Sequence, residues 1–413
     1  MAAHHRSDVF IAGAGVVGLC LGLALKRALA GSLAVTVCDP VLARPLREDG
    51  RAFAIAAGPR RMFETLGVWD GIAARTQPIL DMIVTDSKVA DPVRPVFLTF
   101  AGEVEAGEPF AHMAEHTALL AALTQAAREA GVVLLADTVR SSAPDSEGVD
   151  IRLGSGDTAS ASLLAACDGA RSPLREEAGI TRVAWSYRQS GIVATIGHER
   201  EHEGRAEEHF LPSGPFAILP LPGRRSSIVW TERTEDVPAI LGLDGEDLLA
   251  EIERRFGLHL GALTLETKPA AYPLSFAIAR RFVADRMALV GDAAHIVHPI
   301  AGQGLNLGLR DAAALAEVVV ARAALGLDPG APDVLAAYER ARRFDTLLMG
   351  AVTDGLNRLF SNDLTPVRML RDLGLGVVER LPVLKSTLIR QAAAFGPEMP
   401  RLLRGEPLPG MAA

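Results

Sequence analysis

The stretch MALVGDAAHIVHPIAGQGLNLGLRD, residues 287–311, decides the fold of this chain, and the rest of the sequence can be interpreted around it. Its first four residues are apolar and precede Gly291 and Asp292, which is typical of a buried strand ending in a turn with a carboxylate at its tip. A Gly-Gln-Gly turn at 302–304 then precedes a run of helical composition. Such a turn leaves backbone N–H groups unpaired, and the helix dipole favours negative charge there. The stretch therefore predicts a site for an anion, or for a ring that becomes anionic on reduction.

A Gly-x-Gly turn alone is weak evidence, because glycine is common in turns that bind nothing. Here the order strand, Gly-Asp, His-x-x-His-Pro, Gly-x-Gly, Asn and helix is too long to arise by chance. The stretch resembles the flavin-contacting segment of the FAD-dependent aromatic hydroxylases, the p-hydroxybenzoate hydroxylase family, and within it the ubiquinone-biosynthesis branch. By that resemblance Asp292 would bind the ribityl chain of FAD, and the turn and helix start would face the pyrimidine edge of the flavin. The residues that the resemblance places there are Pro299, Gly302, Gln303, Gly304, Leu305 and Asn306.

The N-terminal segment has the composition of a secretory leader, but its details favour another interpretation. Residues 9–25 are apolar or glycine, and Ala-Leu-Ala follows at 28–30. However, Lys26 and Arg27 lie between this run and the supposed cleavage site, and the run is shorter than the roughly 20 residues of a membrane span. We therefore expect a strand, a helix and a second strand, at residues 8–12, 15–30 and 33–38.

The glycines between the first strand and the helix form a dinucleotide-binding fingerprint. Gly13, Gly15 and Gly18 follow the GxGxxG pattern, which allows a tight turn, close approach of a pyrophosphate and close helix packing. Asp39 ends the second strand 21 residues after Gly18, where a carboxylate would bind the ribose hydroxyls of adenosine. The related family usually has the longer Glu at this position. The fingerprint does not separate FAD from NAD, but the second Gly-Asp segment at residue 291 favours FAD, because an NAD domain normally completes its site locally.

Two further positions complete the predicted cofactor site. Arg51 precedes a strand-like segment and matches, by the resemblance, an arginine beside the flavin; a solvated surface residue is the alternative. Asp168 begins an Asp-Gly-Ala-Arg-Ser sequence after an apolar strand, and Arg175 follows one turn later. A carboxylate and two guanidiniums around a glycine turn suit a polar ligand edge and its phosphates, although a capped helix start is the alternative. Together the three motifs span residues 8–311 and indicate one FAD-binding cradle.

The remaining sequence predicts how the chain divides. Strand-like runs alternate with turns at 189–273, which predicts a mainly antiparallel sheet that covers the flavin and forms a substrate pocket. After residue 332 the apolar residues follow a helical period, as they do again at 367–395, where Pro382 is expected to break or kink the helix. We expect an α/β (α+β) fold with a Rossmann-like FAD-binding domain at 1–76, 109–180 and 281–345, a β-sheet substrate domain at 77–108 and 181–280, and a helical region at 346–413.

Composition narrows the class of protein. The chain has 413 residues, 49% hydrophobic and 22% charged, which is typical of a globular protein with a sizeable core and more than one domain. A net charge of −8 does not favour nucleic-acid binding. Cys20, Cys38 and Cys167 are widely spaced and form no CxxC pair, which favours a reducing cytosol and argues against disulfides or a metal site. We expect a cytoplasmic protein without a bilayer-spanning stretch; peripheral contact with the inner face of the membrane is the alternative.

The resemblance also implies an activity. It implies a monooxygenase with non-covalent FAD that uses NAD(P)H and O2, and that hydroxylates a polyprenylated phenol in ubiquinone biosynthesis through a C4a-hydroperoxyflavin. Other ubiquinone-biosynthesis proteins and a second copy of the chain are the partners it suggests. The choice between NADPH and NADH stays open. No general base is assigned: His295 and His298 lie in the flavin segment, but a structural histidine is at least as good an interpretation of each.

Two other activities stay open from the sequence. One is a flavin hydroxylase of a small soluble aromatic acid, which an enclosed polar pocket with an arginine at its base would favour. The other is a weakly catalytic flavoprotein subunit of a lipid-biosynthetic complex, which a lack of NAD(P)H oxidation with any phenol would favour.

Overall fold

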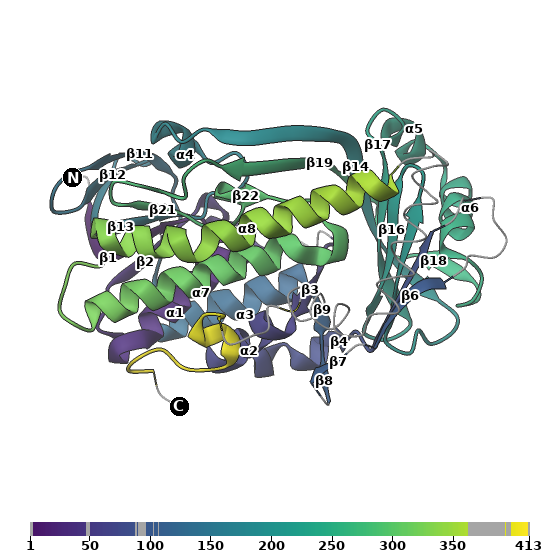
Figure 1. Cartoon of the computed structure of the whole chain (residues 1–413), viewed down its shortest axis with the longest axis horizontal. Coiled ribbons are helices and arrows are strands. Elements are labelled where there is room, and N and C mark those ends of the chain that lie inside the picture. Colours follow the sequence, from purple (N-terminus) through teal and green to yellow (C-terminus); the bar gives the residue numbers. More distant parts are fainter. Residues whose placement is uncertain are drawn as a thin grey trace.

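Two large β-sheets joined by a layer of long helices make up the molecule, a computed structural model (Figure 1). It describes residues 3–46, 50–86, 89, 96–101, 103–105, 107–361, 393 and 398–411. The helix expected at 367–395, with its break at Pro382, lies outside the described residues apart from position 393. The expected α/β fold is confirmed.

The first sheet has eight strands and a parallel centre in the order β10, β2, β1, β13. The far side of β13 pairs with β12 in its first half and with β21 in its second half. Val9, Phe10 and Ile11 of β1 are fully buried, as expected for a central strand covered on both faces. The strands are β1 (His4–Ala12), β2 (Val35–Cys38), β10 (Val133–Leu135), β11 (Val139–Pro144), β12 (Val149–Leu153), β13 (Thr158–Ala166), β20 (Val283–Ala284) and β21 (Met287–Leu289).

Long helices cover this sheet. α7 packs between α1 and α8, and in Figure 1 α7 and α8 run side by side from the first sheet toward the second. The crossing of α1 and α7 is close because Gly308 has no side chain; a Cβ there would lie 2.7 Å from the Val17 side chain. The helices are α1 (Val16–Arg27), α2 (Ala57–Thr65), α3 (His116–Ala130), α4 (Pro173–Glu177), α7 (Gln303–Ala323) and α8 (Pro332–Phe360).

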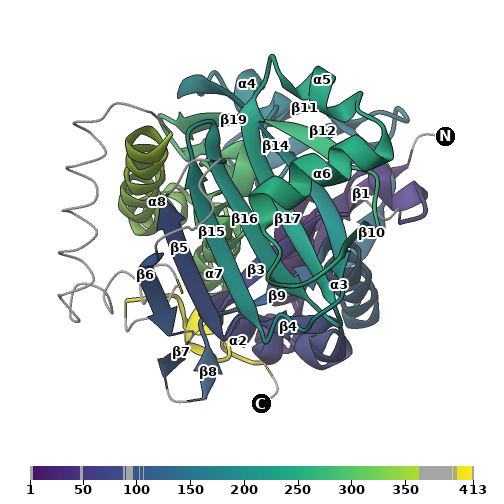
Figure 2. The same ribbon diagram turned by 90° about the vertical axis from the view of Figure 1, so that its right-hand side faces the viewer.

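The second sheet has nine strands, antiparallel except for the pair β15 and β5. One face packs on α6, which crosses the front of the sheet in Figure 2, and the other faces the helical layer. The elements are β5 (Asp81–Asp86), β6 (Val96–Ala101), β14 (Arg182–His198), β15 (Arg205–Leu211), β16 (Gly214–Leu221), β17 (Arg225–Arg233), β18 (Leu263–Leu265), β19 (Ala270–Ala279), β22 (His295–Ile296), α5 (Val237–Leu241) and α6 (Gly245–Phe256).

Small elements and two long strands join the two halves of the molecule, each built on one of the large sheets. A three-stranded sheet of β3 (Ala52–Ala56), β9 (Ala111–Glu115) and β4 (Thr76–Pro78) lies between them, and β7 (Glu103–Glu105) pairs with β8 (Glu108–Pro109). β14 and β19 pair along most of their length and run between the two halves (Figure 1).

Several element bounds differ from the sequence predictions. The helix expected at 15–30 ends at Arg27, because Leu29 and Ala30 adopt positive φ angles of 50° and 54°. The first strand of the region expected at 189–273 begins earlier, at Arg182, and runs to His198, because it pairs with β19 and then with β17 and β18. α8 runs without interruption through the expected boundary at 345/346, so that division falls within one helix. Among the described residues, no helix is both long and apolar enough to cross a bilayer.

Candidate active site

The three motifs that lie far apart in sequence meet at one edge of the first sheet. Ala12 of β1 pairs with Ala166 of β13, which pairs in turn with Leu289 of β21. The glycine fingerprint, the Asp-Gly turn and the second Gly-Asp turn therefore all follow the carboxyl ends of adjacent parallel strands. Open α/β sheets bind nucleotides at this edge.

The glycine fingerprint leaves room for a phosphate. A Cβ at Gly13 would lie 2.2 Å from the Cys167 carbonyl oxygen, and one at Gly18 would lie 2.1 Å from the Gly13 carbonyl oxygen, so both positions require glycine. A Cβ at Gly15 would meet nothing within 4 Å. Gly15 also begins α1 without a side-chain cap, so N–H groups at the helix start remain available to an anion. These residues fit the pyrophosphate of FAD.

Asp39 braces the fingerprint loop. Its Oδ2 accepts from the Ala14 N–H at 2.9 Å, and its Oδ1 accepts from the Val41 N–H at 2.8 Å. The carboxylate is half-buried at the end of β2. Each carboxylate oxygen keeps a further lone pair that is free to accept from a ribose hydroxyl. The contact with a ribose itself remains a prediction.

The Asp168 turn contains a buried acceptor without a partner. Oδ2 accepts from the Leu174 N–H at 3.2 Å, whereas Oδ1 is buried and lacks a hydrogen bond within the described part of the chain. Burial raises the pKa of this carboxyl, and the Ser172 hydroxyl lowers it. Because buried polar atoms in proteins almost always have partners, Oδ1 is available to a cofactor hydroxyl.

Arg175 binds backbone groups of two turns. It is 2% exposed, and its Nη1 donates to the carbonyl oxygens of Ala293 at 3.0 Å and Ala170 at 3.3 Å. Its charged group is buried between two turns, and Nη2 has no hydrogen-bond partner among the described residues. Contact of Arg175 with a ligand phosphate remains a prediction. Arg175 joins the Asp168 turn to the Gly291 turn.

The Gly291 turn presents a carboxylate at the edge of the sheet. Gly291 has a φ of 64°, and its N–H donates to Oδ2 of Asp311 at 3.0 Å. Asp292, the next residue, is exposed. The surrounding protein raises the pKa of its carboxyl by desolvation, while the charges of His295 and Arg51 lower it. This is an accessible acceptor at the position predicted for the ribityl chain.

The start of α7 offers the expected cap for a flavin ring. Gly302 caps the helix at a φ of 63° without a side-chain hydrogen bond, and the first turn has no acidic residue. A Cβ at Gly304 would meet nothing within 4 Å, so space is open beside the helix start. Gln303 is buried and Leu305 is half-buried. The helix end fits a ring that carries negative charge when reduced.

Asn306 fastens this turn to β3. Its Oδ1 accepts from the Ala56 N–H at 3.0 Å, and its Nδ2 donates to the carbonyl oxygens of Ala54 at 2.8 Å and Gly302 at 3.0 Å. Both amide hydrogens are used by the backbone. Asn306 therefore positions the turn, and its direct contact with a cofactor remains a prediction.

The structure separates the two histidines of the segment. His295 Nε2 lies 2.6 Å from Oδ2 of Asp311, and both side chains are buried away from the cavity described below. His298 is fully buried but lines that cavity, and neither ring nitrogen has a hydrogen-bond partner among the described residues. Burial lowers the pKa of His298 to about 4, so its imidazole is neutral at pH 7. Of the two, only His298 is placed to meet a substrate.

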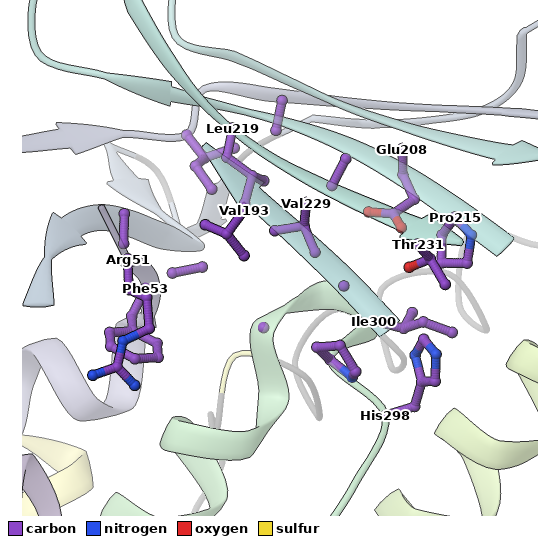
Figure 3. A pocket seen from close by; sticks show the side chains of 18 of the residues that line it. Arg51, Phe53, Val193, Glu208, Pro215, Leu219, Val229, Thr231, His298 and Ile300 are labelled. Atoms are coloured by element: carbon purple, nitrogen blue, oxygen red, sulfur yellow. The ribbon is translucent and has the colours of Figure 1, made fainter. Parts of the chain in front are cut away.

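A cavity of about 230 Å³ lies between the Gly302 turn and the inner face of the second sheet (Figure 3). Exposed Pro299 lines it beside His298. Arg51 also lines it; its Nη2 lies 3.0 Å from Nδ1 of His116, and its guanidinium lies 5.8 Å from the centre of the Tyr272 ring. The wall is mostly apolar, with five polar or aromatic-polar side chains: Arg51, Glu208, Thr231, Tyr272 and His298. Apolar walls with a few convergent polar groups are typical of small-molecule sites.

Glu208, Thr231 and Tyr272 are the polar wall residues that the sequence did not single out, and of these Glu208 is the acidic one. It is 5% exposed on β15, and burial raises the pKa of its carboxyl to about 7. The two adjacent glutamates of Ala-Glu-Glu-His-Phe, residues 206–210, were the available signal, because strand alternation must turn one of them inward. Both faces of the second sheet are covered, so the pattern does not say which one.

The comparisons with known proteins agree with this geometry. The sequence family described as FAD binding domain matches residues 6–345. Ubiquinone hydroxylase UbiL of Rhodospirillum rubrum is 48% identical over 411 residues, which are 98% of this chain and 94% of that protein. The 3-demethoxyubiquinol 3-hydroxylase of Escherichia coli is 33% identical over 396 residues, 94% of this chain and 99% of that protein.

The chain belongs to the FAD-dependent aromatic hydroxylases. Within them it belongs to the ubiquinone-biosynthesis branch, as the sequence indicated. The aromatic hydroxylase fold extends to more distant proteins: the crystal structure of p-nitrophenol 4-monooxygenase PnpA from Pseudomonas putida matches with a TM-score of 0.77 at 18% identity, covering 95% of this chain and 99% of that one. At that identity the likeness concerns the fold alone.

Proposed function

We infer that this aromatic hydroxylase adds a hydroxyl group to the ring of a polyprenylated phenol in ubiquinone biosynthesis, with FAD as cofactor and NAD(P)H and O2 as co-substrates. The observation that carries the inference is the apolar cavity between the Gly302 turn and the second sheet, since a ring bound there faces the predicted flavin edge. An engineered cavity of roughly 150 Å³ holds benzene, so about 230 Å³ accommodates one substituted ring. A long prenyl tail does not fit beside the ring and has to leave the cavity.

The residues that we propose for FAD are those of the cradle. The N–H groups around Gly15 would hold the pyrophosphate, Asp39 the ribose, Asp168 and Asp292 the hydroxyls of the ribityl chain, and the α7 start the flavin edge. When bound, FAD takes electrons from NAD(P)H and activates O2 for transfer to the ring. The protein binds and orients the phenol and keeps water away from it, which the apolar wall of the cavity favours. We propose the first sheet with α1, α3 and α7 as the cofactor domain and the second sheet as the substrate domain.

The cavity favours a phenol over an aromatic acid. A hydroxybenzoate would bring a carboxylate into a small apolar space that already contains the Glu208 carboxyl. Arg51 is the single cation lining the cavity among the described residues, and it stands beside His116 and Tyr272. Bringing two carboxyl groups together in a buried site is unfavourable, and it would force one of them to hold a proton.

Localisation and partners follow from the proposed substrate. A polyprenylated phenol resides in the membrane, so we propose a cytoplasmic protein that meets the inner membrane face peripherally. Exposed apolar side chains on α8, such as Phe344 at 74% exposure, are suited to such contact or to another protein of the same biosynthesis.

Quinone profiling of a deletion strain tests the function. We expect the strain to accumulate a prenylated phenol that lacks one ring hydroxyl, and the gene to restore ubiquinone. Purified protein should be yellow, oxidise NAD(P)H faster with a short-chain prenylphenol, and release the hydroxylated product. A normal quinone profile in the deletion strain would contradict the proposal. A changed profile without NAD(P)H oxidation by the purified protein would favour the non-catalytic subunit.

A further inference from the structure

Glu208 is a buried carboxyl that no group of the described residues satisfies. Its side chain is 5% exposed, and the described residues include no hydrogen-bond partner for either carboxyl oxygen. A carboxyl removed from water without a partner is strongly unfavourable, so it is retained only where something compensates for it. Its neighbours across the ladder, Ala217 and Val84, are apolar and offer the carboxyl no hydrogen bond from their side chains.

The carboxyl is directed into the substrate cavity. Figure 3 shows Glu208 on the sheet wall, with the His298 ring on the segment before Pro299, both pointing toward the space between. The alternation of β15 explains this orientation. Glu207, on the opposite face, binds His209 at 3.2 Å and His259 at 2.9 Å, whereas Glu208 lies on the face with the cavity residues.

We propose that Glu208 binds the phenolic hydroxyl of the substrate and accepts its proton. The proposal rests on the proposed function, because it needs a phenol in this cavity. It gives the reaction the base that the histidines do not provide: the His298 imidazole carries a strongly lowered pKa of about 4 and is a weak base, and His295 is bound to Asp311. A deprotonated phenol is the more electron-rich ring and therefore the better acceptor of oxygen.

The proton balance is simple. The phenolic O–H bond breaks and an O–H bond forms on an Oε atom of Glu208, so one negative charge moves from the carboxylate to the phenolate oxygen and no electron pair is oxidised. The new carboxylic acid keeps a hydrogen bond to that oxygen and returns the proton to the product. Burial brings the pKa of Glu208 to about 7. This value is closer to the pKa of a phenol, near 10, than the pKa of an ordinary carboxyl is. Among the described residues, the other titratable groups that line the cavity are Arg51, Tyr272 and His298.

The test compares Glu208→Gln with Glu207→Gln in the FAD-loaded protein. The first exchange keeps shape and removes the base, and the second makes the same exchange on the opposite face. With a short-chain 2-prenylphenol we expect kcat to fall about 10²-fold or more in Glu208→Gln, as for loss of a general base, with KM changed much less. The rise of kcat through neutral pH should disappear. FAD content should be unchanged in both variants, and kcat with its pH profile should be unchanged in Glu207→Gln.

A measurement without turnover separates this proposal from the proposed function. The same prenylphenol is bound to the oxidised, FAD-loaded protein without NAD(P)H, and phenolate absorbance is followed against pH. Wild type and Glu207→Gln should form phenolate at lower pH than the free phenol, and Glu208→Gln should not. An unchanged phenolate titration and an unchanged pH profile in Glu208→Gln would overturn the role of Glu208 while leaving the hydroxylase standing. If the wild type binds no prenylphenol and hydroxylates none, the proposed function fails instead.

Discussion

At the scale of single residues, the glycines of the fingerprint differ in what a side chain at each position would meet. Gly13 and Gly18 lie against backbone carbonyl oxygens, at distances that a Cβ cannot occupy. Gly15 faces open space, so its glycine is not needed for packing. Substitution at Gly15 therefore tests the cofactor site without breaking the fold.

We expect Gly15→Val to fold and to lose FAD. The valine side chain would fill the space where a pyrophosphate approaches the backbone. Flavin absorbance per protein and the circular dichroism spectrum measure the two properties. Gly71→Val is the control, because a Cβ there also meets nothing within 4 Å but lies away from the cradle. Full flavin absorbance in Gly15→Val would disprove our assignment of the fingerprint.

We expect Asp292→Ala to weaken FAD binding by roughly one to two powers of ten. A charge-assisted hydrogen bond contributes about 1.5–3 kcal/mol, and 1.4 kcal/mol corresponds to a factor of ten in Kd. Because the side chain is exposed, its removal leaves no cavity in the core, and the fold should be retained. Fluorescence titration of FAD into the apoprotein gives the Kd, and Asp292→Asn, which retains an acceptor, should fall between the two. Equal Kd values in all three proteins would remove Asp292 from the site.

We expect Glu208→Gln to stabilise the protein at high pH and not at low pH. The pKa of Glu208 is raised from 4.5 to about 7, so the folded protein holds a proton that the unfolded chain releases between these values. The unfolding free energy of the wild type, relative to that of the variant, is therefore greatest below pH 4.5. It falls as pH rises to 7. At 1.4 kcal/mol per pKa unit, the difference reaches about 3–4 kcal/mol. Urea unfolding of both proteins at pH 4.5 and 8 measures it; a pH-independent difference would contradict an ionising, buried carboxyl.

At the scale of elements, α7 connects the cofactor turns to the helical layer. Its first turn caps the predicted flavin site, and one turn and a half later Asp311 is fully buried. Asp311 accepts from the Gly291 N–H, from His295 and from Nε of Arg342 on α8 at 2.7 Å. One carboxylate therefore holds the Gly291 turn, β22 and α8 in register with α7.

We expect Asp311→Asn to cost about 3–5 kcal/mol of unfolding free energy, because it leaves the Arg342 cation buried with one fewer charge partner. Burial raises the pKa of Asp311, but the charges of His295 and Arg342 lower it by a larger amount, so the net shift is downward. Its stabilisation is therefore present above the ordinary carboxyl pKa near 4 and is lost as pH falls through the lowered value.

Urea unfolding at pH 7 measures this cost. Asp333→Asn on α8 is the control, because its pair with Arg322 is largely exposed and should contribute less than about 1 kcal/mol. Similar midpoints for the two variants would show that Asp311 does not hold the layer together.

At the scale of the whole molecule, the cofactor site draws on segments from Gly13 to Asn306, which belong to one sheet and its covering helices. The largest continuous core contains β1, β13, β21, α1 and α7 together. A ligand held by turns of all these elements binds the folded chain and not the unfolded one.

We expect FAD to stabilise the molecule as a unit. At a free concentration 100 times its Kd, a ligand adds about 2.7 kcal/mol to the unfolding free energy. The Tm should rise with FAD concentration by a few degrees, seen equally by circular dichroism and by tryptophan fluorescence. Gly15→Val should show no such rise. A wild-type Tm that does not depend on FAD would argue against a cradle that spans these segments.

The sequence by itself determined the local parts of this protein. Glycine spacing predicted the fingerprint loop, because Gly13 and Gly18 meet constraints set by the turn and its immediate neighbours. Apolar runs predicted the strands and most of the helices, since the spacing at which apolar residues repeat follows from backbone geometry. The Gly-Asp segment before α7, together with its resemblance, indicated the family that the comparisons confirm.

Only the tertiary structure decided which of these residues line the cavity and which are bonded to other parts of the protein. Arg175 Nη1 and Asn306 bind backbone groups of segments far away in sequence, which no local pattern reveals. His295 and His298 are three residues apart, yet one binds Asp311 and the other lines the cavity. Alternation identifies an inner face only when the outer face meets water. Both faces of the second sheet are covered, so the inward direction of Glu208 follows from strand pairing and from α6 on the far side.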